Sequence, residues 1–156
     1  DNGHVNSGST FAGSPAGCAA AIKTLQIFER DGIVAQAAKL GQIVEAVTRD
    51  WESYDIVRQV RGNGLLIGVS FERASQTGSE GENWWIARAV RGEMLERGVW
   101  AISDHEDTIR LYPALNMNED TLRAGLHIME EAIQSVSSVA DIEEDSAAYP
   151  TGVAGF

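Results

Sequence analysis

The 156-residue chain is short of positive charge, cysteine and long apolar runs. It has 12 basic residues against 23 acidic ones, which gives a formal net charge of -11. Such an acidic protein repels phosphate backbones, so no nucleic-acid partner is expected. The apolar runs are far too short to span a bilayer, so no membrane partner is expected either. A single cysteine, Cys18, excludes an internal disulfide, and a soluble, reducing, cytoplasmic setting is predicted.

Residue types that carry much enzyme chemistry are also scarce. The chain has two lysines, Lys23 and Lys39, and three histidines, His4, His105 and His127. The histidines share no spacing with one another, and no cysteine or carboxylate pattern beside them has the form of a metal site. No metal is therefore predicted.

Apolar residues make up 44% of the chain and include four tryptophans, enough to bury a core. The length fits one domain or a piece of a larger protein. The first residue is Asp1 in a Gly/Asn/Ser-rich run, and this start predicts a fragment. Trp84, Trp85 and Trp100 are predicted to lie in a core or a domain interface, and Cys18 to be buried.

Local patterns predict the order of helices and strands. Ser14 and Pro15 form an N-cap and first helical position, and Asn118 caps a later helix. Helices are expected at about 15–30, 34–53, 83–97 and 119–135, strands at 56–61, 65–71, 99–102 and 108–112, and a loop at 74–82. The segment 62–64, Gly-Asn-Gly, predicts a hairpin between the first two strands. This order predicts an α+β fold, a small, mainly antiparallel sheet covered by helices on one face.

Two segments carry residues suited to binding anions. Residues 8–15 combine glycines with the hydroxyls of Ser9 and Thr10 at the start of a helix, which suits a phosphate. An ordinary capped loop would have the same composition. Arg110 lies in an otherwise apolar strand, where its guanidinium either binds a carboxylate bidentately or forms an ion pair within the protein.

Together and in this order, these segments resemble class III pyridoxal-phosphate-dependent aminotransferases. That group includes ornithine, acetylornithine, 4-aminobutyrate and ω-amino-acid aminotransferases. The matching segments are residues 9–15 (STFAGSP), 18–21 (CAAA), 60–68 (VRGNGLLIG), 95–99 (LERGV) and 109–115 (IRLYPAL). The resemblance covers roughly residues 6–135. Ser14 departs from the usual asparagine or histidine, and Ala114 from the second proline of the strand motif.

The resemblance implies the C-terminal domain of a fold-type I transferase. Residues 1–32 would form the cofactor-phosphate loop and an interdomain helix at the end of the large domain. Residues 33–138 would form the small domain, and 139–156 an acidic, flexible tail. The lysine that forms the Schiff base lies upstream of this loop in the family, so no catalytic residue is expected in this chain. Lys23 and Lys39 are predicted to lie on the surface or between domains.

The resemblance also implies roles for individual residues. Thr10, assisted by Ser9, would contact the pyridoxal 5'-phosphate of the neighbouring subunit, which makes a homodimer the expected assembly. Arg110 would bind the carboxylate of the substrate, and Arg61 with Gly62 would form a mainly structural turn.

The implied reaction transfers an amino group from an amine or ω-amino acid to a 2-oxo acid. The isolated chain would be inactive, because the Schiff-base lysine lies outside it. Other pyridoxal-phosphate enzymes of the same fold type, such as a decarboxylase, racemase or aminomutase, remain alternatives. A non-catalytic α+β module for dimerisation or small-anion binding is another.

Overall fold

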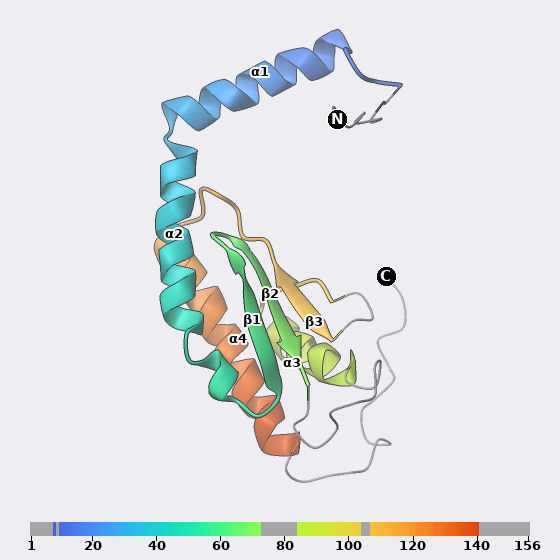
Figure 1. The fold of residues 1–156 in the computed structure, drawn as a ribbon, viewed down its shortest axis with the longest axis vertical. Coiled ribbons are helices and arrows are strands. Elements are labelled where there is room, and N and C mark those ends of the chain that lie inside the picture. The colour runs from blue at the N-terminus through green and yellow to red at the C-terminus, as the bar shows by residue number, and fades with distance from the viewer. Residues whose placement is uncertain (1–7, 9, 73–83, 104–106, 141–156) are drawn as a thin grey trace, which may run out of the picture.

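The computed structural model describes residues 8, 10–72, 84–103 and 107–140 (Figure 1). Two helices come first, followed by a short 3-10 helix and a strand pair, and further helices and a last strand complete the fold. The elements are α1 (Pro15–Arg30), α2 (Ile33–Thr48), η1 (Trp51–Ser53), β1 (Val57–Asn63), β2 (Leu66–Phe71), α3 (Trp84–Glu96), β3 (Thr108–Leu111) and α4 (Glu119–Ala140).

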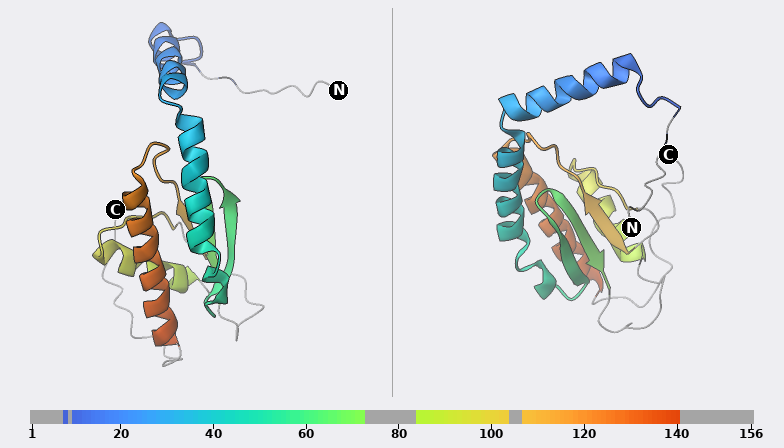
Figure 2. Two further views of the ribbon diagram at one scale, coloured as in Figure 1. Left: turned by 90° about the vertical axis from the view of Figure 1, so that its left-hand side faces the viewer. Right: turned by 45° about the horizontal axis from the view of Figure 1, so that its top comes forward.

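The strands form a three-stranded antiparallel sheet in the order β1-β2-β3. Helices α3 and α4 cover one face of this sheet, and α2 packs beside α4 (Figures 1 and 2). Alternate side chains of a strand point to opposite faces, and the buried set points to the helices. That set includes Ile67, Val69, Phe71 and Ile109, which join the core with Met94 and Met129. The predicted α+β fold, with helices on one face of a small antiparallel sheet, is confirmed.

The predicted strand at 99–102 is wrong. Its last residue, Ile102, makes one isolated bridge to Arg110, and the other three residues pair with no strand. The reason lies at the end of α3, where Gly98 adopts a φ of 86°. This turn directs the backbone N–H of Val99 onto the carbonyl of Met94, at 2.8 Å, so the amide is used to close the helix.

Two predicted helix ends also differ from the structure. The second helix ends at Thr48, and its expected last turn is replaced by η1, where Trp51 is completely buried. The last helix continues to Ala140, five residues past the expected end at Ser135. Its start agrees with the sequence, because Asn118 Oδ1 accepts the backbone N–H of Asp120 at 2.8 Å. The predicted loop at 74–82 lies outside the described residues.

The predicted hairpin is confirmed, with a shorter link. Asn63 pairs with Leu66, so two residues, Gly64 and Leu65, connect β1 to β2. Gly64 has a φ of 60°, which costs little only for glycine. Gly62 lies inside β1, and a Cβ there would stand 2.1 Å from the carbonyl oxygen of Leu66. Only glycine fits that close approach of the two strands.

A second close approach connects α2 to this hairpin. A Cβ on Gly41 would lie 2.6 Å from the Cα of Gly64. The absence of a side chain on Gly41 therefore lets the helix rest directly on the link between the strands. Leu40 and Val44, on the same stretch of α2, are buried in the core beside it.

Helix α1 contributes no buried residue and projects away from the layered part of the molecule (Figure 1). Ile22 and Leu25 are exposed by 57% and 64%, so its apolar side chains face outward. Cys18 is exposed as well, which makes its predicted burial wrong. Its small-residue surroundings on α1 resemble a packed helix, but no other described element of this chain covers them.

The predicted placement of the tryptophans holds in part. Trp85 is half-buried and packs against the core, whereas Trp100 is 71% exposed. The side chain of Trp84 lies outside the description. Among the described residues, no helix is both long enough and apolar enough to cross a bilayer.

Candidate functional site

The face of the sheet that points away from the helices places two arginines in one row. Arg61 on β1 pairs with Gly68 on β2, and Gly68 pairs with Arg110 on β3. Directly opposite residues of neighbouring strands project to the same face. With strands about 5 Å apart, the two arginine backbones stand about 10 Å from each other, with a glycine between them. This row is the candidate site.

Arg110 is fixed from both sides of its strand. Its neighbour Ile109 is fully buried in the core, which anchors the strand, and the arginine itself is half-buried. On the side away from β2, the backbone N–H of Arg110 donates to the carbonyl of Ile102 at 2.9 Å. Pro113 follows the strand and ends it. The guanidinium therefore extends from a well-defined backbone position on the outer face of the sheet.

A chain of hydrogen bonds crosses the sheet in the neighbouring row. Arg61 Nη1 donates to Ser70 Oγ at 2.7 Å, and Ser70 Oγ lies 2.9 Å from Thr108 Oγ1. Thr108 Oγ1 in turn lies 2.9 Å from Asp107 Oδ1. Ser70 and Thr108 are exposed by 0% and 5%, so their hydroxyls depend on these partners for hydrogen bonds. We call these four residues the relay.

The chemistry of the groups fixes the direction of the relay. An ionised carboxylate only accepts hydrogen bonds, so Thr108 uses its one hydroxyl hydrogen on Asp107. Ser70 must then donate to Thr108, and it accepts from the guanidinium of Arg61. At the Asp107 end of the relay, Arg58 forms an ion pair, with its Nη2 2.9 Å from Asp107 Oδ2. The relay thus runs from a cation on β1 to an anion immediately before β3.

The relay includes residues that sequence reasoning missed. Ser70 is a single hydroxyl in an apolar strand, and Thr108 stands at the start of the arginine strand. Their pairing depends on the strand register, which sequence patterns do not specify. The predicted role of Arg61 in a turn is wrong. It lies within β1, three residues before the link, and its side chain bonds across to β2.

The predicted phosphate loop lies at the N-terminal end of α1. Residues 10–13 form a turn in which Thr10 is exposed and Gly13 has a φ of 77°. Ser14 occupies the N-cap position, but its side chain makes no capping hydrogen bond. Its carbonyl accepts the backbone N–H of Cys18 at 2.9 Å, so the helix begins as predicted. Ser9 lies outside the described residues.

The structure does not bring Thr10 and Arg110 together. The turn that carries Thr10 is at the end of α1 remote from α2, apart from β3 in each view (Figures 1 and 2). Lys23 and Lys39 are both exposed, on α1 and α2. His127 is exposed on α4, near Glu131. His4 and His105 lie outside the description.

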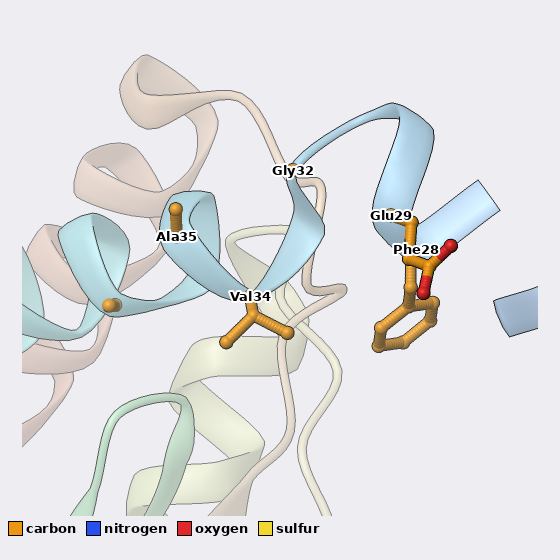
Figure 3. A pocket seen from close by; sticks show the side chains of 6 residues that line it. Phe28, Glu29, Gly32, Val34 and Ala35 are labelled. Carbon is orange, nitrogen blue, oxygen red and sulfur yellow. The ribbon is translucent and has the colours of Figure 1, made fainter. Parts of the chain in front are cut away.

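An open, apolar hollow lies elsewhere, at the elbow between α1 and α2 (Figure 3). Its wall is formed by Phe28, Glu29, Gly32, Val34, Ala35 and Ala38. It contains one charged side chain and neither of the arginines of the row. The hollow reflects the thin contact between the two helices and is not the candidate site.

Comparisons with known proteins agree on one family. The model of the family described as aminotransferase class-III matches residues 2–133. An ornithine aminotransferase of Emericella nidulans is 29% identical over 143 residues, which cover 92% of this chain and 30% of that protein. The mitochondrial ornithine aminotransferase of Rattus norvegicus is 32% identical over 128 residues, which cover 82% of this chain and 27% of that protein. The chain therefore spans under a third of the length of these relatives.

Solved structures give the same result. A transaminase variant with SMBA superposes with a TM-score of 0.76 at 26% identity, over 87% of this chain and 32% of that one. The acetylornithine aminotransferase of Elizabethkingia anophelis superposes with a TM-score of 0.69 at 28% identity, over 83% and 31%. With the family match across most of the chain, these similarities show that the chain belongs to the class III aminotransferases.

Proposed function

We propose that this chain is the C-terminal part of a homodimeric, pyridoxal-phosphate-dependent aminotransferase. The whole protein transfers an amino group from an amine or ω-amino acid to a 2-oxo acid. The observation that carries this proposal is Arg110, which the outer face of the sheet presents within a chain of this family. The chain alone is expected to be inactive, because its two lysines are exposed helix residues and the resemblance to the family implies a Schiff-base lysine upstream of residues 8–15.

The start of α1 suits the phosphate of the cofactor. Helix N-termini bind anions through amide N–H groups that have no partner within the helix. Here Ser14 leaves those groups without a side-chain cap, and the nearby hydroxyl of Thr10 is exposed. The residues present therefore fit a phosphate. The cofactor, when bound, supplies the carbonyl carbon that takes up and returns the amino group.

Arg110 suits a carboxylate group of the substrate. A guanidinium presents parallel N–H groups that match a carboxylate, and a partly buried, fixed position strengthens the interaction. Binding of the carboxylate at Arg110 would orient the amino or oxo carbon with respect to the cofactor. An amine without a carboxylate would gain nothing from this contact.

Absorption spectroscopy of the full-length protein that carries this chain tests the reaction. With pyridoxal phosphate bound, an ω-amino acid added alone is expected to bleach the visible cofactor band. Pyruvate or 2-oxoglutarate added afterwards is expected to restore it, because an aminotransferase works in two halves. A band that persists with every amine, or that bleaches and cannot be restored by any 2-oxo acid, would contradict transamination. A protein that never forms the band would support the binding-module alternative.

Replacement of Thr10 by alanine tests the phosphate contact. We expect the dissociation constant of the cofactor to rise roughly 10-fold, because a hydrogen bond to a charged group is lost. Thr10→Ser retains the hydroxyl and is expected to bind the cofactor nearly as well as the wild type. The constant is measured by titrating the full-length apoprotein and following the cofactor band. Equal constants for Thr10→Ala and Thr10→Ser would contradict the role.

Mixed dimers test whether Thr10 acts across the subunit boundary. One subunit carries Thr10→Ala, and the other lacks the Schiff-base lysine. The assay uses a cofactor concentration that loads the wild type but leaves the Thr10→Ala dimer mostly unloaded. If Thr10 reaches the neighbour's cofactor, the mixed dimer contains one intact site and is more active than either parent dimer. If Thr10 serves its own subunit, both sites of the mixed dimer remain defective and its activity does not exceed that of the Thr10→Ala dimer.

A further inference from the structure

Arg61 differs from the neighbouring arginine of its own strand in its bonding partner. Arg58 pairs with the carboxylate of Asp107, whereas Arg61 bonds to the neutral hydroxyl of Ser70. Within the part of the chain that the structure describes, Arg61 forms no ion pair. Its positive charge is therefore held in place by a hydrogen bond that does not neutralise it.

The held side chain lies beside the residue that pairs with Arg110. A Cβ added to Gly68 would lie 3.8 Å from Arg61 Cγ and 3.9 Å from Arg61 Nε. The same atom would lie 3.5 Å from the methyl carbon of Thr108. Gly68 is thus flanked by the side chains of Arg61 and Thr108, next to Arg110 in the row. The hydrogen bonds of the relay fix both side chains.

An arginine on an exposed strand has many rotamers, most of which would carry its charge away from this row. The relay selects one of them, because the bond to Ser70 keeps the side chain across Gly68. Ser70 directs its own hydrogen to Thr108, which leaves the lone pairs of its hydroxyl oxygen to accept that bond. Thr108 is in turn directed by Asp107. Loss of the Ser70 hydroxyl would release Arg61, and loss of the Thr108 hydroxyl would leave the hydrogen of Ser70 free to rotate toward the guanidinium.

We propose that Arg61, held by the relay, adds a second positive charge to the carboxylate site of Arg110, and that Ser70 and Thr108 are positioning residues for this charge. The inference rests on the proposed function, because it takes Arg110 as the carboxylate ligand. Arg61 acts through the field at the row and need not touch the substrate. The ligand class is an anionic carboxylate on the amino donor or the 2-oxo acid.

Steady-state kinetics of the full-length enzyme tests the inference. Arg61→Gln, Ser70→Ala and Thr108→Val are each expected to raise the KM of a carboxylate-bearing substrate by roughly threefold to tenfold, the effect of one partly screened charge at this range. The kcat at saturation and the KM of an amine without a carboxylate are expected to stay unchanged. A purely structural defect would change the kcat and the KM values of both kinds of substrate together.

Matched variants separate charge from folding. Arg61→Lys retains the charge and Thr108→Ser retains the hydroxyl, so each is expected to preserve most of the affinity. Arg123→Gln removes a cation that pairs with Glu119 on the surface of α4, and is expected to leave the KM unchanged. The KM of the wild type is also expected to rise more steeply with salt than that of Arg61→Gln.

The outcomes distinguish this inference from the proposed function. If Arg110→Gln leaves the KM of carboxylate substrates unchanged, the proposed role of Arg110 fails. If Arg110→Gln raises that KM and Arg61→Gln does not, the proposed contribution of Arg61 is overturned, while the proposed carboxylate site at Arg110 stands. If Arg61→Gln raises it and neither Ser70→Ala nor Thr108→Val does, the positioning role of the relay is overturned.

Discussion

Replacement of Gly62 by alanine is expected to lower the free energy of unfolding by about 3 kcal/mol or more. A Cβ at this position would stand 2.1 Å from the carbonyl oxygen of Leu66, which is backbone and cannot rotate away. The strands would have to separate where Gly62 pairs with Ile67, a core residue. Gly62 also has a φ of 154°, which side chains rarely tolerate. Both effects act on the hairpin that carries the row of arginines.

Urea unfolding of the chain, followed by circular dichroism, measures this change. Gly92→Ala on α3 is a matched control, because a Cβ there meets nothing within 4 Å. Alanine favours a helix over glycine, so this control is expected to stabilise the chain by about 0.5–1 kcal/mol. If Gly62→Ala unfolds at the same urea concentration as Gly92→Ala, the close approach at the hairpin is wrong.

Replacement of Arg110 by glutamine is expected to raise the KM of carboxylate-bearing substrates roughly 30- to 100-fold in the full-length enzyme. The change removes a charge-assisted, bidentate contact and keeps a polar side chain of similar length. The strand itself should persist, because Ile109 and the backbone bond to Ile102 hold it independently of the side chain. The loss should therefore appear in substrate binding and not in folding.

The control for this prediction is an amine that lacks a carboxylate, whose half-reaction should proceed as in the wild type. Arg110→Lys keeps the charge without the planar fork and should show an intermediate KM. Rapid mixing of the cofactor-loaded protein with each amine, followed by absorbance, gives the rate of the half-reaction and its dependence on the concentration of the amine. An equal loss for amines with and without a carboxylate would mean that Arg110 supports the site generally and does not bind the carboxylate.

Much of the fold could be predicted because local chemistry determines it. Pro15 and Gly32 delimit α1, Asn118 caps α4, and the glycines at 62–64 predict a hairpin. Apolar residues at helical spacing give each later helix a buried side, which includes Leu40, Val44 and Met94. Arg110 was identifiable because a charge in an apolar strand requires a partner or a ligand.

The rest depends on contacts between distant segments. The register Asn63–Leu66 shortens the hairpin link and moves Arg61 out of the turn and into the row. The bond from Val99 to Met94 removes a predicted strand. Burial of Cys18 was inferred from its small neighbours on α1, yet the described part of this chain offers nothing to cover that helix. None of these contacts leaves a periodic signal in the sequence.

The contact between Gly41 and Gly64 has a mechanical consequence. Because the helix rests on the hairpin link with no side chain between them, α2 cannot slide or roll without displacing that link. The other end of α2 continues through Gly32 into α1, which no described part of the core restrains. A swing of α1 would therefore be taken up at Gly32, while α2 and the strands stay together as one rigid body. The end of the chain that carries Thr10 would then change its position without changing the direction in which Arg110 points.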